Sequence, residues 1–292
     1  MLYRRKILLA ITELFGGELS ATNFQKLLFL FTDEQNHKLY EFVPYKFGCF
    51  SFQAMADKNK LIQEGYLINS KNWKNNFNET SFVNVLKEDD RFALRKLKKK
   101  FGNYKTEELI KYIYSNYPYF AINSEIAVDH LSNKEIETVD KFRPKNLNSC
   151  LYTIGYEGKS LEKYLNDLIR NDIKVLCDVR KNPLSRKYGF SKKTLQNACE
   201  SLNIKYIHFP ELGIISEKRK NLNSQNDYDA LFEEYENTVL EEQQQALKLL
   251  TDLLKNYKRI ALTCFEHSPN QCHRTRVANA VIRNDDYPLT HI

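Results

Sequence analysis

The segment from Cys264 to Arg274 holds a dense group of reactive side chains. It follows an apolar run that predicts a buried strand, crosses a proline-containing loop and leads into a predicted helix. A helix start offers free backbone N–H groups and the positive end of the helix dipole, which together favour anions. Arg274 adds a forked donor suited to phosphate or carboxylate. We therefore predict an anion-binding site here.

Two other interpretations fit the same segment. Cys272, near a helix start, would have a lowered thiol pKa and could act as a nucleophile, with His273 as acid or base. The Cys-x5-Arg cradle of thiol phosphatases is absent, since Arg274 lies two residues after Cys272, so anion binding is preferred. A metal site formed by Cys264, His267, Cys272 and His273 is least favoured because the spacing matches no common zinc pattern.

Polar residues also follow the other predicted strands. Ligands of open parallel sheets bind beyond the carboxyl ends of the strands, so these residues should meet at one pocket. Taken singly, each has a structural explanation; Asp178, for example, could cap a loop or pair with Arg180. Taken together, they favour a site. The predicted catalytic residues are Glu157, Asp178, Glu266, Cys272 and His273. The predicted anion- or substrate-binding residues are Gly155, Tyr156, Arg180, Ser185, Arg186 and Arg274.

Three of these residues are carboxylates, Glu157, Asp178 and Glu266. Crowded carboxylates separate one another's pKa values, which suits paired acid and base roles in glycosidic-bond cleavage. The same acids could hold Mg²⁺ for phosphoryl chemistry. The residues do not decide between acid–base catalysis and Mg²⁺ binding. We predict no cofactor and no metal ligands, with a divalent metal as the alternative. Tyr156 and Phe190 could stack a base.

The elements that must position these residues begin at Cys150. Strands predicted over 150–155, 173–180, 204–210 and 259–266 alternate with helices over 161–171, 192–202, 228–256 and 272–283. This order predicts an α/β fold with a mainly parallel, Rossmann-like sheet and helices on both faces. A change of pattern places a domain boundary near residue 148, giving domains 1–148 and 149–292.

The first domain is predicted to be mostly helical and winged-helix-like. Helices over 4–15, 22–31 and 52–64 precede a short strand at 65–69 and a polar wing or loop at 70–80. A further helix is expected at 106–114. The most basic stretch, 91–101, could face phosphates, although a solvated helix face is the commoner explanation. Its predicted nucleic-acid contacts are Lys96, Lys98, Lys99 and Lys100.

Four motifs in order resemble the domain of unknown function 488 family. They are "TIG" at 153–155, "DVR" at 178–180 with Pro183, Ser185 and Arg186, "PELG" at 210–213, and "CFE…CHR" from Cys264 to Arg274. The resemblance covers about 150–285 and implies an α/β fold with a shared pocket. It implies no settled reaction. Gly213 is followed by Ile214-Ile215, where many members carry another glycine.

The N-terminal part resembles Panacea-type domains. Lys26, Leu27 and Leu28 match their K-L-L motif, while Phe47-Gly48-Cys49 lacks the proline that usually follows the glycine. That resemblance implies a helical interaction module tied to toxin–antitoxin and phage-defence proteins.

Composition and charge restrict the expected binding partners and the expected cellular compartment. The net charge of +7 suits a polyanionic partner as well as simple solubility. The absence of a long apolar run or a signal peptide, and of any regular cysteine framework, predicts a cytoplasmic protein with reduced thiols and no membrane partner. We expect an enzyme acting on nucleic acid, DNA more than RNA, or on nucleotides, by hydrolysis or transfer at an N-glycosidic or phosphoester bond. The alternative is a non-enzymatic nucleotide sensor or DNA-binding regulator.

Two further segments carry alternatives. Residues 213–227 are long and polar, with Lys218, Arg219 and Lys220, and are predicted to form a lid or a phosphate-contacting arm, with disorder as the alternative. The helix rich in Glu241, Glu242 and the glutamines 243–245 could pair subunits in a homodimer or simply be solvated.

Overall fold

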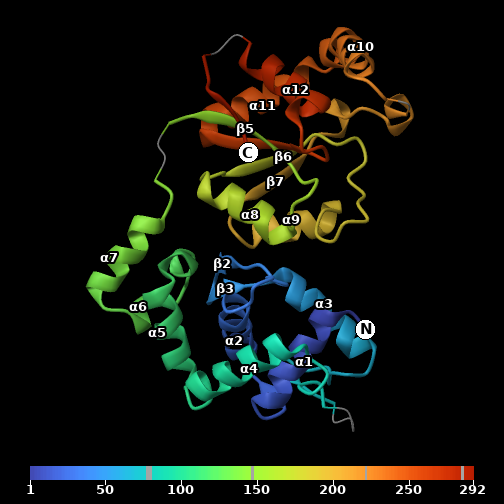
Figure 1. Ribbon diagram of the computed structural model, residues 1–292. Helices are drawn as coiled ribbons and strands as arrows, with labels where there is room; N and C mark the ends of the chain where they lie inside the picture. Colours follow the sequence, from blue (N-terminus) through green and yellow to red (C-terminus); the bar gives the residue numbers. More distant parts are fainter. Residues whose placement is uncertain (77–80, 146–147, 221, 284–285) are drawn as a thin grey trace. The chain divides into compact units, whose positions relative to one another are not determined.

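The chain divides into two compact units, Met1–Arg143 and Pro144–Ile292. The structure is a computed structural model that describes residues 1–292 except 77–80, 146–147, 221 and 284–285 (Figure 1). Within the described residues, no helix is long and apolar enough to cross a membrane.

The N-terminal unit is built mainly from helices, as the sequence predicts. Its helices are α1 Tyr3–Leu14, α2 Ala21–Asp33, α3 Phe52–Gln63, α4 Glu88–Phe101, α5 Thr106–Asn116, η1 Pro118–Ala121, α6 Ala127–His130 and α7 Asn133–Phe142. Two antiparallel pairs join β1 Glu18–Leu19 to β4 Trp73–Lys74 and β2 Val43–Tyr45 to β3 Gly48–Phe50. The Ser20 side chain caps α2 by accepting a hydrogen bond from the Asn23 N–H. Along α2, Phe24, Leu28 and Phe31 are fully buried, because apolar residues recur at helical spacing.

The strand predicted at 65–69 is reduced to an isolated bridge between Leu67 and Asn75. Gly65 ends α3 at φ 78°, and the N–H groups of Tyr66 and Leu67 both donate back to the carbonyl of Leu61. These backbone donors therefore complete the helix end instead of a sheet. Part of the predicted wing, residues 77–80, lies outside the described residues.

The C-terminal unit has the Rossmann-like α/β fold that the sequence predicts. Its five strands are all parallel in the order β7-β6-β8-β5-β9. They are β5 Cys150–Gly155, β6 Val175–Asp178, β7 Lys205–His208, β8 Arg259–Cys264 and β9 Leu289–His291. The central strands β5, β6 and β8 are buried along their whole length, as apolar strands covered on both faces should be.

Helices cover both faces of this sheet (Figure 1). The chain moves from β5 to β6 and β7 through α8 Leu161–Arg170 and α9 Lys192–Glu200, which share one face. It then reverses direction through α11 Gln244–Tyr257 and α12 His273–Ile282, which lie on the other face because each crossover is right-handed. Three 3₁₀ turns lie in loops: η2 Pro210–Leu212, η3 Ser216–Arg219 and η5 Pro269–Gln271.

The single helix predicted at 228–256 is interrupted. The structure has α10 Gln225–Tyr235, the π-helix η4 Glu236–Leu240, and then α11. A single π turn inserted into a helix is not visible in the 3.6-residue periodicity of the apolar residues. Such turns commonly occur at functional sites.

The fold predicts losses of stability of very different size at two neighbouring leucines of α11. Leu250 is fully buried in the core cluster between α11 and the sheet, whereas Leu249 is 56% exposed. We expect Leu250→Ala to lower the free energy of unfolding by about 2–5 kcal/mol, and Leu249→Ala by less than about 0.5 kcal/mol. Urea denaturation of both variants measures this, and equal losses would contradict the packing of α11.

Candidate active site at the carboxyl ends of the sheet

Two close backbone contacts join the loops at the carboxyl ends of the strands. A Cβ on Gly155, the last residue of β5, would lie 1.9 Å from the carbonyl oxygen of Glu266. A Cβ on Gly213 would lie 2.0 Å from the backbone nitrogen of Lys181. Neither position accepts a side chain without moving backbone. The two motif glycines therefore allow the loops after β5 and β8, and those after β6 and β7, to pack against each other.

Arg274 holds the loop after β8. Its side chain is 1% exposed, and its two terminal nitrogens donate to the carbonyls of Glu266 at 2.5 Å and His267 at 3.1 Å. The Glu157 carboxylate accepts from the His267 N–H at 2.9 Å. Arg274, predicted to bind an anion, thus uses both of its terminal nitrogens to position backbone, and Glu157 fastens the same loop from an exposed position.

Asp178 and Arg180 form a buried pair at the end of β6. Arg180 donates to both carboxylate oxygens of Asp178, at 2.8 and 2.5 Å, and the Tyr206 hydroxyl donates to the same carboxylate. Arg180 also donates to the Tyr156 hydroxyl and the Phe190 carbonyl. The rings of Tyr156 and Phe190 stack on each other at 4.3 Å and are buried. Arg180 thus links Asp178, Tyr156 and Phe190 inside the protein.

The loop after β6 is less buried than the Asp178–Arg180 pair that precedes it. The Ser185 hydroxyl accepts from the Lys187 N–H and thereby shapes the loop. The Lys187 amine donates to the Tyr156 carbonyl at 3.0 Å. Arg186 is exposed, which leaves its side chain accessible to an anion.

The most reactive group lies where β8 ends and α12 begins. Cys264, Cys272 and His273 each offer a ligand atom, and these atoms lie within 4.8 Å of one another. The Cys264 sulfur is 3.7 Å from His273 Nδ1 and 3.4 Å from a carboxylate oxygen of Glu266. Arg219 forms an ion pair with the other oxygen of that carboxylate. We name Cys264, Cys272, His273, Glu266 and Arg219 the thiol–carboxylate centre.

The ring orientation of His273 follows from its second contact. His273 Nε2 lies 2.9 Å from the carbonyl oxygen of Val179. A carbonyl oxygen only accepts, so Nε2 carries the proton of the neutral ring. Nδ1 then presents its lone pair toward the Cys264 sulfur.

The electrostatics of the centre differ from the expectation for Cys272. Burial and the neighbouring Cys264 sulfur raise the pKa of Cys272. Burial alone would raise the pKa of Cys264. The contacts with Cys272 and His273 outweigh burial and lower the pKa of Cys264 well below its usual value. Burial, followed by the charge on Cys264, raises the pKa of Glu266, while Arg219 acts in the opposite direction. The more acidic thiol is therefore Cys264.

Two members of this environment were not among the predicted site residues, although Arg219 was named in the predicted lid or arm. Arg219 reaches Glu266 from η3, inside the polar segment 213–227. Tyr235, the last residue of α10, places its ring edge-on to His273 at 5.8 Å between centroids. The basic character of the polar segment was a usable signal for Arg219; no local pattern marked Tyr235.

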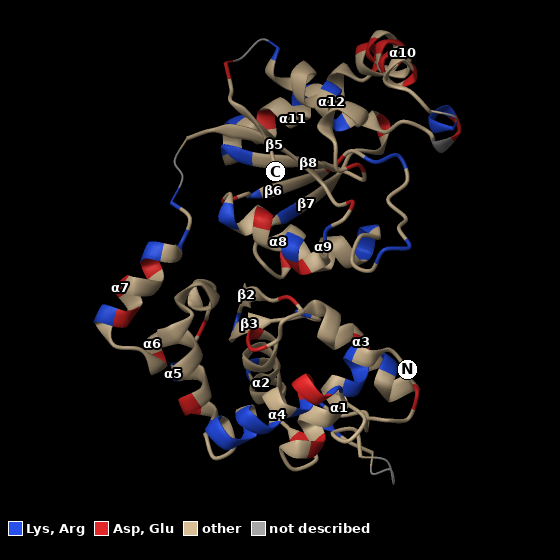
Figure 2. Ribbon diagram, in the orientation of Figure 1, with Lys and Arg blue, Asp and Glu red and all other residues tan. Residues whose placement is uncertain are grey.

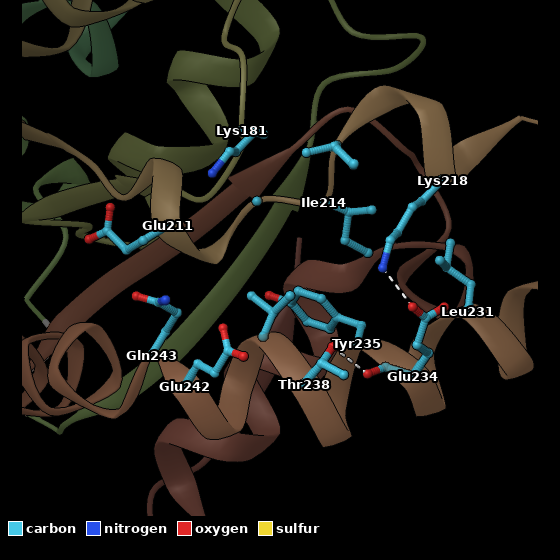
Figure 3. Close-up of a pocket in the computed structure, with 13 residues that line it drawn as sticks. Lys181, Glu211, Ile214, Lys218, Leu231, Glu234, Tyr235, Thr238, Glu242 and Gln243 are labelled. Atoms are coloured by element: carbon cyan, nitrogen blue, oxygen red, sulfur yellow. Dashed lines mark hydrogen bonds and ion pairs between the residues drawn. The ribbon is translucent and has the colours of Figure 1, made fainter.

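Tyr235 also forms part of a pocket of about 240 Å³ (Figure 3). The loops after β6 and β7 line one side of this pocket, and α10, η4 and the start of α11 line the other. Lys218 crosses its edge to pair with Glu234 at 2.6 Å (Figure 3). The pocket and His273 thus both contact Tyr235, whose hydroxyl donates to the Leu212 carbonyl.

The lysines predicted to contact nucleic acid lie on α4 (Figure 2). Lys96 pairs with Glu34 at 2.6 Å, Lys98 lies over the Phe15 ring, and Lys100 donates to the Tyr112 hydroxyl. Lys99 is exposed. Lys96, Lys98 and Lys100 therefore already contact other side chains of the N-terminal unit.

Residues 160–281 match the model of one family. Its description is Domain of unknown function DUF488. The C-terminal unit carries a DUF488 domain. The match includes Asp178, Arg180, Glu266, Cys272 and His273 and confirms the resemblance seen in the motifs. No curated protein and no solved structure matches the chain.

The buried pair of this DUF488 domain predicts a large stability effect. Asp178→Asn leaves the Arg180 charge buried without its counter-ion, so we expect a loss of about 3–5 kcal/mol in the free energy of unfolding. Glu234→Gln, which removes one partner of the exposed Lys218–Glu234 pair, should cost less than about 1 kcal/mol. Denaturant titration distinguishes the two; similar losses would show that Asp178 and Arg180 are not a buried pair in solution.

Proposed function

We propose that the C-terminal unit is a hydrolytic enzyme acting on a nucleotide or nucleic acid. The observation that carries the proposal is the Glu266 carboxylate, which lies beside the Cys264 sulfur and is paired with Arg219. This centre occupies the carboxyl ends of a parallel sheet, the usual location of ligand sites in such folds. A carboxylate in this position can take a proton from an attacking water and return it to the leaving group.

Solvent reaches the centre at Glu266 and Arg219. Their side chains are 15% and 23% exposed, whereas Cys264, Cys272 and His273 are at most 1% exposed. A substrate would thus meet the carboxylate and the guanidinium first. Arg219 can stabilise negative charge that develops on the reacting group.

Exposed cations on the neighbouring loops suit a phosphate-bearing substrate. Lys181 and Arg186 follow β6, and Lys218 and Lys220 lie in the segment after β7 (Figure 2). Phe265, between Cys264 and Glu266, is 43% exposed and can stack a base. Tyr156 and Phe190, which the sequence suggests could stack a base, instead stack on each other.

A second candidate is covalent catalysis by Cys264. Its contact with His273 Nδ1 at 3.7 Å resembles a nucleophile beside its acid or base. Intact-protein mass spectrometry after rapid quenching distinguishes the two routes. A substrate-derived adduct lost in Cys264→Ser supports the covalent route; turnover without an adduct supports direct attack by water.

The proposal predicts a selective loss in Glu266→Gln. Turnover should fall by at least about 100-fold because the amide cannot transfer the proton, while substrate affinity changes little. Hydrolysis of nucleotides and of single- and double-stranded DNA and RNA would be followed by mass spectrometry of released base, phosphate or ammonia.

Glu217→Gln is the matched control, since this exposed acid lies in the same segment as Arg219. Equal activity of wild type and Glu266→Gln would refute the proposal. Binding of these substrates without any product would instead favour the sensor.

A further inference from the structure

Cys264, Cys272 and His273 surround a common point in the buried part of the centre. Their ligand atoms lie within 4.8 Å of one another, and each residue is at most 1% exposed. Zinc binds cysteine sulfur at about 2.3 Å and histidine nitrogen at about 2.0–2.1 Å in a tetrahedral arrangement. Such bond lengths place the ligands of one ion about 3–4 Å from one another. We propose that these three side chains bind one Zn²⁺ ion.

The orientation of His273 supports this assignment independently of distance. Its Nε2–H donates to the Val179 carbonyl, so Nδ1 directs its lone pair toward the Cys264 sulfur. Zinc-bound histidines usually donate their other N–H group to a carbonyl or carboxylate, which fixes the tautomer and the ring. His273 already has this second contact.

The ligands also sit on rigid elements. Cys264 is the last residue of β8, Cys272 is the N-cap of α12, and His273 is the first residue of that helix. Arg274 holds the connecting loop through two carbonyls.

The fourth position would belong to water. Catalytic zinc sites combine three protein ligands with a bound water, and a nearby carboxylate takes its proton. Glu266 lies 3.4 Å from Cys264 and faces the solvent-accessible side. Glu266 would take a proton from the bound water and leave a hydroxide. The hydroxide would bond to the electrophilic atom of the substrate, the bond to the leaving group would break, and Glu266 would return the proton to that group. No electron is transferred. This role rests on the hydrolytic function proposed above and identifies water as its nucleophile.

Metal analysis of the purified full chain tests the site. The protein would be produced with zinc in the medium, without a histidine tag, and dialysed against a mild chelator. We expect one zinc ion per chain in wild type by mass spectrometry of the metal, and a loss of more than about tenfold in Cys264→Ser, Cys272→Ser and His273→Asn. Cobalt-loaded wild type should show thiolate-to-cobalt absorption.

Two control variants separate ligands from neighbours. Cys150→Ser changes a buried cysteine at the opposite end of the sheet and should keep its zinc. Glu266→Gln should also keep its zinc but lose hydrolysis, because Glu266 moves a proton and is not a ligand.

Zinc retained in a Cys264→Ser/Cys272→Ser double variant, or cobalt-loaded wild type without thiolate absorption, would overturn the site. The cobalt spectrum of wild type decides the matter even if a variant fails to fold. Turnover by zinc-free protein would overturn the zinc role and leave the hydrolytic function standing. Zinc bound by these residues without any turnover would uphold the site and overturn the hydrolytic function.

Discussion

The buried guanidinium of Arg274 holds the loop after β8 against the end of β5. It donates to two consecutive carbonyls, those of Glu266 and His267, and the first of these carbonyls packs against the bare backbone of Gly155. Because the loop is folded back in this way, Cys264 at the strand end meets Cys272 at the helix start. The positions of Glu266, Cys272 and His273 relative to Cys264 depend on this arrangement, and Arg219 joins them from η3.

Four arginines near the carboxyl ends of the sheet differ in how far solvent can reach them. Arg180 and Arg274 are at most 6% exposed, and their donors go to Asp178, to Tyr156 and to backbone carbonyls. Guanidinium groups are well suited to such rigid, multiple hydrogen bonds. Arg186 remains exposed, and Arg219 lies between these extremes because it pairs with Glu266 at the solvent side. Arg186 and Arg219 therefore remain accessible from solvent, while the buried pair and Arg274 hold the loops in place.

Much of the fold followed from the sequence because strand–helix alternation is a local pattern. The four apolar strands and most helices were predictable from periodicity, and the family motifs pointed to the same domain. The short strand β9, Leu289–His291, gave no such pattern, since it is three residues long, is exposed at Thr290 and His291, and is a strand because it pairs with β5. The π-helix η4 likewise inserts a turn that a helical period does not reveal.

The site was predictable only in part. Glu266, Cys272 and His273 were expected at one pocket, and the structure places them together with Cys264. Pairing with Arg180 was the structural alternative to a catalytic role for Asp178, and the structure shows that pair. The sequence did not decide between the two because it does not show that both side chains are buried together. Nor does a spacing rule for zinc motifs apply to ligands that come from a strand end and a helix start. Their proximity is a consequence of the loop held by Arg274.

A crystal structure of the zinc-loaded protein, with anomalous scattering measured at the zinc edge, would show whether Cys264, Cys272 and His273 bind zinc. We expect an anomalous peak about 2.3 Å from the sulfurs of both Cys264 and Cys272 and about 2.0–2.1 Å from His273 Nδ1, with an oxygen in the fourth position facing Glu266. A zinc peak elsewhere, or a disulfide joining Cys264 to Cys272, would contradict it.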